Sequence, residues 1–313
     1  MEREKRDERA HYDKESLKAM IMMKNVILKT QHTVVICKFC DKPDFVMRYG
    51  KTKEGKQRYV CAKCKRTFID NKAPERMRFP TEVIASAISL FYEGLSLHKI
   101  RRQLKLTYGV MPDHSSIYNW IVRYTKKAAK AFDTTKIRTG NTWVADETVL
   151  KLKSGGGENV WLFDCMDEDT RFLLATHLTP HRYTKDAQVL MEKAERRTDR
   201  IPKAIITDKL RSYLDAVEKT WGADTKHVQS SPFSLQQSTR SIERLHGTLK
   251  DRMKIMRGLT NKETAKLIMD GWGIHYNFFR PHSGLEGKTP AEVAGAKAPY
   301  KSWAEVVKDR ESK

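Results

Sequence analysis

The stretch from Ala204 to Met256 constrains this chain more than any other, because it joins an apolar strand to an amphipathic helix and carries acids on both. The β-branched run AIIT, residues 204–207, is followed at once by Asp208, which places a carboxylate at the end of a buried strand. A helix is predicted from about Ser241 to Met256, because apolar residues recur at steps of three and four. They are Ile242, Leu245, Leu249, Met253 and Met256.

Three polar residues share one side of this predicted helix. Glu243 lies beside the apolar stripe, and Lys250 follows seven residues later, about 700° around the helix and therefore on the same face. His246, at the i+3 position from Glu243, lies on the same side. The helix thus presents a carboxylate, an imidazole and a cation in one direction.

A third carboxylate is expected from an upstream strand. Asp146 lies in NTWVADETVLKLK, where Trp143, Val144 and Val149 indicate a strand. Carboxylates from a strand, a strand end and a helix can share a divalent ion of the Mg²⁺ type, which takes oxygen ligands and retains waters. Asp146, Asp208 and Glu243 are therefore the predicted metal ligands.

These residues and their surroundings resemble a known family. Asp146, Asp208 and Glu243, with residues 209–242 between the last two, resemble the D-D-E triad of insertion-sequence transposases and retroviral-type integrases. ITDK around the second acid, IERLHGTLK around the third and YNFFRPHSGLEGKTPAEVAG at residues 276–295 resemble the same family, and Lys250 matches its basic residue. The resemblance spans about residues 143–295. It implies a ribonuclease H-like α/β core with a mixed sheet, Mg²⁺ (or Mn²⁺) as cofactor, and Lys250 beside the DNA phosphate.

The charge of the chain indicates a polyanionic partner. The 313 residues carry a formal net charge of +21, which favours nucleic acid. No apolar run reaches the roughly 18 residues that a membrane helix needs, so no membrane contact is expected. The first 16 residues, MEREKRDERAHYDKES, lack an apolar signal core. We therefore expect a cytoplasmic, nucleoid-associated protein. Residues 1–30 are predicted as a charged N-terminal arm, either helical or partly ordered.

Four of the five cysteines form two matched pairs. Cys37 and Cys40 make one C-x2-C knuckle, and Cys61 and Cys64 make the other, with residues 41–60 between them. Thiolates at this spacing can close a tetrahedral Zn²⁺ site, which predicts a zinc ribbon over residues 31–72. A disulfide pair is the alternative, disfavoured by a reducing compartment. Cys165 is predicted to be a core residue.

The segment 78–132 is predicted to form an all-α, helix-turn-helix DNA-binding domain. Helical patterns run over about 81–93, 96–104 and 114–130, and Gly94, Gly109 and Pro112 separate them. SSIYNWIVRY is the predicted recognition helix, with Ile117, Trp120, Ile121 and Tyr124 as core. The predicted DNA contacts there are Ser115, Ser116, Tyr118, Asn119 and Arg123. A plain helical bundle is the alternative.

Further elements complete a multidomain chain. Strands are expected at about 143–152, 159–166, 171–178, 203–207 and 223–228, and helices at about 185–196, 210–220, 262–279 and 290–294. Residues 140–296 form the predicted catalytic domain, and residues 297–313 a basic C-terminal tail. Arg240, Arg244 and His246 are predicted to contact DNA, with a partly buried imidazole as the alternative for His246.

Other acids are not expected to join the site. Glu147 follows Asp146, so it should point to the opposite face of the strand, and Asp164 is predicted to face solvent. We expect a transposase that binds the terminal inverted repeats of its own element, as a homodimer or higher oligomer, and transfers strands into target double-stranded DNA. The alternatives are a DNA-binding regulator with an inactive nuclease-like core and a plain nuclease.

Overall fold

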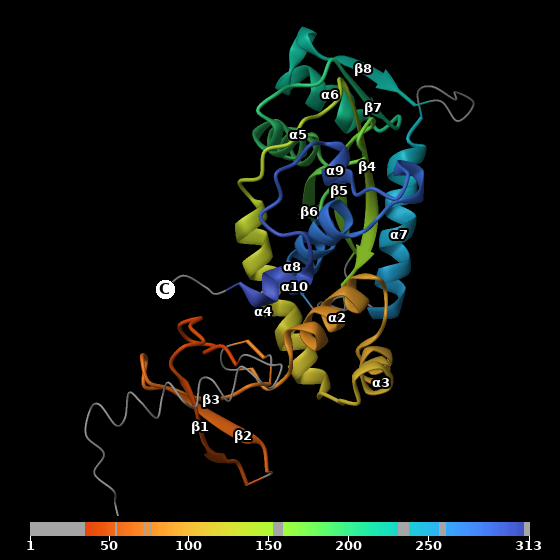
Figure 1. Cartoon of the computed structure of the whole chain (residues 1–313). Coiled ribbons are helices and arrows are strands. Elements are labelled where there is room, and N and C mark those ends of the chain that lie inside the picture. Colours follow the sequence, from red (N-terminus) through yellow and green to blue (C-terminus); the bar gives the residue numbers. More distant parts are fainter. Residues whose placement is uncertain are drawn as a thin grey trace, which may run out of the picture. The chain divides into compact units, whose positions relative to one another are not determined.

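The computed structural model describes residues 35–53, 55–71, 73–74, 77–152, 159–230, 238–256 and 261–309 (Figure 1). The predicted N-terminal arm, residues 1–30, lies outside the described residues. By its contacts the chain divides into two units, residues 1–80 and residues 81–313. Each unit is described separately below.

The first unit is built on a small antiparallel sheet. Its strands are β1 (Val46–Lys51), β2 (Gln57–Cys61) and β3 (Thr67–Ile69), in the order β1-β2-β3. Gly55, at φ 79°, turns the chain between β1 and β2, and a side chain would be strained in that conformation. The core consists of Cys37, Val46, Cys61 and Phe68, so two of the cysteines are part of what holds the sheet together.

The second unit begins with three helices at the positions that the sequence predicts. They are α2 (Thr81–Tyr92), α3 (Leu97–Tyr108) and α4 (His114–Phe132). Gly94, at φ 101°, separates the first two, and the hydroxyl of Ser96 caps α3 by accepting from the Lys99 backbone N–H at 3.3 Å. Gly109 ends α3 in the left-handed conformation, which glycine adopts without strain.

A five-stranded mixed sheet follows. Its strands are β4 (Thr142–Lys151), β5 (Asn159–Asp167), β6 (Leu173–Thr179), β7 (Ala204–Thr207) and β8 (Lys226–Gln229), in the order β6-β5-β4-β7-β8. The neighbours β4, β5 and β6 are antiparallel, whereas β4, β7 and β8 run parallel. Three antiparallel strands extended by parallel ones form the mixed sheet of a ribonuclease H-like core, so this prediction is confirmed.

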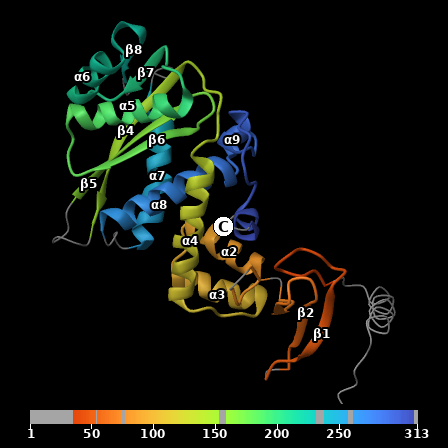
Figure 2. The ribbon, with the colours of Figure 1, turned by 90° about the vertical axis from the view of Figure 1, so that its left-hand side faces the viewer.

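Helices cover both faces of the sheet, and Figure 2 shows α5 and α7 on opposite sides of it. On one face lie α5 (Thr184–Thr198) and α6 (Arg211–Thr220), where the ring of Phe163 meets Tyr213 at 6.0 Å. On the other lie α7 (Arg240–Met256) and α8 (Lys262–Ile274), which continues as a π-helix over His275–Phe279. The short elements are η1 (Gly222–Asp224), η3 (Ser283–Leu285) and α9 (Pro290–Val293). Among the described residues, no helix combines the length and apolar character that crossing a membrane requires.

The three N-terminal helices share this unit with the sheet, although the sequence predicts separate segments at 78–132 and 140–296. The connection is apolar: Phe132, at the end of α4, packs against Phe278 with ring centroids 4.2 Å apart. The segment predicted as a basic tail, residues 297–313, is described up to residue 309. There the chain forms α10 (Trp303–Lys308), which packs against α2 and buries Trp303, Val306 and Val307.

Candidate functional site

Asp146 and Asp208 lie side by side at the junction of two parallel strands. The register pairs Val144 of β4 with Ile206 of β7, so the two acids, each two residues further along, come level with each other. Asp208 directly follows β7, and its Oδ1 accepts a hydrogen bond from the Leu210 backbone N–H at 2.9 Å. Asp208 therefore stabilises the turn into α6 through Oδ1, and a cation could be bound through Oδ2.

Glu147 joins these two acids, contrary to the prediction that it is separate from them. Single carboxylate oxygens of Asp146, Glu147 and Asp208 all lie within 4.8 Å of one another. Alternation along a strand fixes the direction of Cβ, but the longer glutamate side chain extends back to the end of β7. We call these three residues the acidic cluster.

A partly exposed arginine, Arg182, holds the buried Glu147 side chain. The guanidinium of Arg182 donates from Nη2 to Glu147 Oε1, and it lies over the ring of Trp161 at 4.2 Å from the centroid. The Glu147 side chain is only 3% exposed. Burial raises its pKa, and the nearby Asp208 carboxylate adds to this, while the charge of Arg182 opposes it.

His246 of α7 contacts Asp146 on the face of the sheet opposite to α5 and α6. Its Nδ1 is 3.5 Å from Asp146 Oδ2, and its Nε2 is 3.1 Å from Asp164 Oδ2. Burial disfavours the charged imidazole, but hydrogen bonds and charge from Asp146 and Asp164 outweigh it and raise the pKa of His246 to about 9. The imidazole is therefore a cation that holds two carboxylates together at neutral pH.

Two predictions fail at this contact. Asp164 is predicted to face solvent but is 1% exposed, because α7 covers that face of β5. His246 is predicted to contact DNA but is 4% exposed, so no DNA can reach it in this structure. Its alternative, a buried imidazole, describes what is found.

Glu243 lies on α7 outside the acidic cluster. Its side chain accepts a hydrogen bond from the Thr239 hydroxyl at 2.7 Å, and the residue is exposed. It precedes His246 by three residues, about 4.5 Å along the helix axis, so it lies one turn from the residue that contacts Asp146. Lys250, also exposed, lies one turn beyond His246 in the other direction.

The predicted DNA-contact residues other than His246 lie at the surface. Ser115, Asn119 and Arg123 of α4 are exposed, and Ser116 and Tyr118 are partly so. The four predicted core residues of the same helix, Ile117, Trp120, Ile121 and Tyr124, are buried. On α7, Arg240 and Arg244 are exposed near Glu243.

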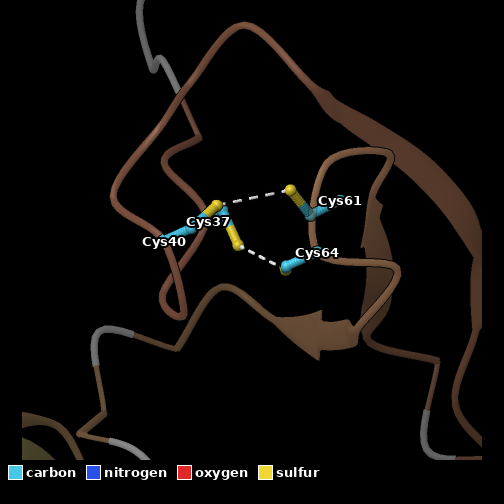
Figure 3. Close-up of side chains that lie close together, drawn as sticks. All are labelled: Cys37, Cys40, Cys61 and Cys64. Atoms are coloured by element: carbon cyan, nitrogen blue, oxygen red, sulfur yellow. Dashed lines mark hydrogen bonds between the residues drawn. The ribbon is translucent and has the colours of Figure 1, made fainter.

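The four paired cysteines converge in the first unit (Figure 3). Their sulfurs lie within 4.8 Å of one another, with Cys37 and Cys64 at 3.6 Å and Cys40 and Cys61 at 3.6 Å. All four are free thiols, so the disulfide alternative does not describe this structure. A tetrahedron of sulfurs around zinc, at about 2.3 Å from the metal, has edges of about 3.8 Å. The donor set and its spacing fit such an ion.

Sequence reasoning missed Glu147, Arg182 and Asp164 as members of the site. The dipeptide Asp146-Glu147 offered one signal, since two adjacent acids inside an apolar strand are costly to bury without partners. Asp164, between Phe163 and Cys165, carried the same signal. Nothing in the spacing of Arg182 pointed to its partner.

One family model matches part of the second unit. The model of the DDE_Tnp_IS240 family, described as a DDE domain, matches residues 140–282. No curated protein matches the chain.

Several retroviral integrases resemble the chain weakly in structure. The HTLV-2 integrase catalytic core domain in complex with magnesium has 14% identity and a TM-score of 0.38, and the match covers 50% of this chain and 97% of that one. The catalytic core domain of BIV integrase has 16% identity and a TM-score of 0.36, with 49% and 93% covered. The simian T-cell lymphotropic virus intasome in complex with PP2A regulatory subunit B56 gamma has 16% identity and a TM-score of 0.38, with 70% and 78% covered.

Proposed function

We propose that this chain, whose residues 140–282 match a DDE domain, is a transposase. In this proposal it cuts DNA at the ends of its own mobile element and joins those ends to target DNA. The observation that carries the proposal is the level placement of Asp146 and Asp208 on neighbouring parallel strands. Two carboxylates in that position, beside a helix that bears a third, suit the metal-dependent transfer of a phosphodiester bond.

The acidic residues fit a divalent ion of the Mg²⁺ or Mn²⁺ type. Such ions prefer carboxylate oxygens, and oxygens of Asp146, Glu147 and Asp208 lie within 4.8 Å of one another, while Glu243 lies outside this cluster on α7. Asp146, Asp208 and Glu243 would hold the metal. When bound, it would lower the pKa of an attacking water or DNA 3′-hydroxyl and stabilise the leaving oxygen.

The chain's own residues then position the DNA. Lys250 lies on the Glu243 face of α7, where its ammonium would hold a phosphate beside the site as a point charge. Arg240 and Arg244 are exposed near the beginning of α7 and would extend this contact along the backbone. His246 does not touch DNA; its imidazolium holds the Asp146 carboxylate in place.

Recognition of the element ends is assigned to α4. Its exposed polar face carries Ser115, Asn119 and Arg123 at helix spacing, with the apolar residues of the same helix buried behind them. A helix presenting such a face can enter the major groove. The net charge of +21 supports contact with the phosphate backbone.

Zinc binding is proposed for Cys37, Cys40, Cys61 and Cys64, which would make the first unit a zinc ribbon. The ion would replace a larger apolar core, because few large side chains are buried in the part of this unit that the structure describes. Pairing two element ends for joining needs at least two copies of the catalytic domain, so a homodimer or higher oligomer is proposed as the active form.

The test is the Asp208→Asn variant, assayed with Mg²⁺ on double-stranded DNA that carries the flanks of its own gene. Cleavage and joining should fall on the order of 10³-fold or more, since several kcal/mol of transition-state stabilisation are lost. Binding of the same DNA in a gel-shift assay should persist.

Asp251→Asn is the matched control. Asp251 lies exposed on α7 and pairs with Lys254 at 3.2 Å, away from the acidic cluster, so this variant should retain activity. Full activity of Asp208→Asn would refute the assignment. A wild-type protein that binds DNA but neither cuts nor joins it would be a regulator, and one that cuts without joining would be a nuclease.

A further inference from the structure

The acidic cluster contains one carboxylate that the D-D-E triad does not use. Glu147 is 3% exposed and brings an oxygen to within 4.8 Å of both Asp146 and Asp208. Its Oε2 is buried and makes no hydrogen bond among the described residues, although the buried Tyr213 hydroxyl, which also makes none, lies near this carboxylate. Burying a carboxylate oxygen without a hydrogen bond is costly, so Oε2 is suited to accept a cation or a hydrogen-bond donor.

The other oxygen of Glu147 is fixed. Oε1 accepts from Arg182, which lies in the segment between β6 and α5, and the guanidinium lies over the ring of Trp161. With Oε1 held in this way, the side chain cannot turn away from the cluster without breaking a charged contact. The arginine also offsets the negative charge that Glu147 adds beside Asp146 and Asp208.

We propose that Glu147 is a ligand of the catalytic metal ion, binding it through Oε2 while Oε1 remains with Arg182. The inference rests on the proposed function, because it concerns the same divalent ion. Arg182 is then a positioning residue: it touches neither metal nor DNA, and it sets the direction of the carboxylate that does. A cation at the cluster would receive Glu147, Asp146 and Asp208 from the sheet, and Glu243 from α7.

The competing explanation is that Glu147 and Arg182 form a structural ion pair. A pair of this kind, in which one partner is buried, can stabilise the fold without any ligand, and breaking it is costly. The two explanations differ in one measurable quantity. A ligand changes the affinity of the protein for Mg²⁺, whereas a structural pair changes only the stability of the metal-free protein.

The experiment measures Mg²⁺ binding to the full chain by isothermal titration calorimetry, without DNA. Mg²⁺ is the probe because thiolate sites select softer ions, so the cysteines of the first unit do not contribute. In Glu147→Gln the amide oxygen can still accept from Arg182, while the negative charge is removed. The Kd for Mg²⁺ should rise at least about 10-fold, the range seen when groups around metal sites are altered.

Glu195→Gln is the matched control. The Glu195 carboxylate accepts from the Trp221 indole N–H at 2.8 Å on α5, outside the acidic cluster. Its Mg²⁺ affinity should equal that of the wild type. A second readout is the rise in the thermal midpoint when Mg²⁺ is added, which should be smaller in Glu147→Gln than in the wild type and in Glu195→Gln.

Each result separates this inference from the proposed function. If Glu147→Gln binds Mg²⁺ as tightly as the wild type while Asp208→Asn does not, Glu147 is no ligand and the proposed function stands. If the wild type itself binds no Mg²⁺, both are overturned. Should Glu147→Gln fail to fold, Glu147→Asp keeps the charge but withdraws the carboxylate by one methylene. Weakened Mg²⁺ binding in it supports the inference, and unchanged binding overturns it.

Discussion

Replacing His246 by glutamine should destabilise the unit of residues 81–313, and the loss should be larger at pH 6 than at pH 9.5. The imidazole lies between Asp146 and Asp164, and the second of these carboxylates is 1% exposed. Glutamine can still donate one hydrogen bond, but it supplies no positive charge. Asp164 is then left buried without a counter-charge, a situation that costs about 3–5 kcal/mol in measured cases.

The titration of His246 gives a second estimate of the same loss. Burial works against its charge, yet the two carboxylates raise its pKa from 6.5 to about 9. One pKa unit corresponds to about 1.4 kcal/mol, so the charged form contributes about 3 kcal/mol. Because the folded pKa lies above the unfolded one, this contribution is complete below about pH 6.5 and is lost as the pH rises through about 9.

Thermal unfolding followed by circular dichroism, without added divalent ions, measures the effect. For a unit of this size, 1 kcal/mol shifts the midpoint by about 2–4 °C, so His246→Gln should unfold about 6–12 °C below the wild type at pH 6. The gap should narrow towards pH 9.5. The double variant His246→Gln with Asp164→Asn is the control, and it should recover most of the lost stability because no uncompensated buried charge remains at position 164. A gap that is absent, or that is equally wide at both pH values, would refute the reasoning.

Two further predictions concern the cysteine group and α10. Cys61→Ser should lower the zinc content of the purified protein from about one ion per chain to near zero, as measured by atomic absorption. Cys165→Ser, outside the cysteine group, should retain the ion, and equal zinc contents in the two variants would count against the proposed site. Trp303→Ala should destabilise the second unit by about 3–5 kcal/mol, because the indole is 3% exposed, stacks on Tyr92 and donates to His275 Nδ1 at 3.1 Å. Thermal unfolding measures this loss of stability. As a control, Leu214→Ala at an exposed position should cost under about 0.5 kcal/mol. Equal losses in Trp303→Ala and Leu214→Ala would contradict the docking of α10.

The elements of the core could be predicted because their signals are local. The AIIT run before Asp208 gave β7, and the spacing of Ile242, Leu245 and Leu249 gave α7, with all three buried as expected. Glycines with positive φ marked the ends of α2 and α3, where the chain must turn. The positions of Asp146 within a strand and of Asp208 at a strand end were also predicted, whereas the parallel pairing that brings them level came only from the structure.

Contacts between distant segments could not be predicted in the same way. The apolar stripe of α7 was expected to continue to Met253 and Met256, but the structure buries Arg252, whose guanidinium lies 3.8 Å from the centroid of the Phe91 ring on α2. That position depends on which helix lies opposite, which no spacing within α7 reveals. Glu147 belongs to the acidic cluster for a similar reason, because its direction is set by Arg182, 35 residues later.

The packing of α4 on the catalytic core has a consequence for how this protein would measure DNA. Phe132 of α4 is locked between Phe278 and Phe279, and α8 in turn rests on β6. If α4 reads bases as proposed, the packing of α4 on the core fixes the distance between the recognised bases and the phosphodiester bond that is cut. One inserted base pair moves the bond by about 3.4 Å along the duplex. With a fixed distance, the active site cannot follow the displaced bond. DNA with an inserted base pair would therefore bind normally and not be cut.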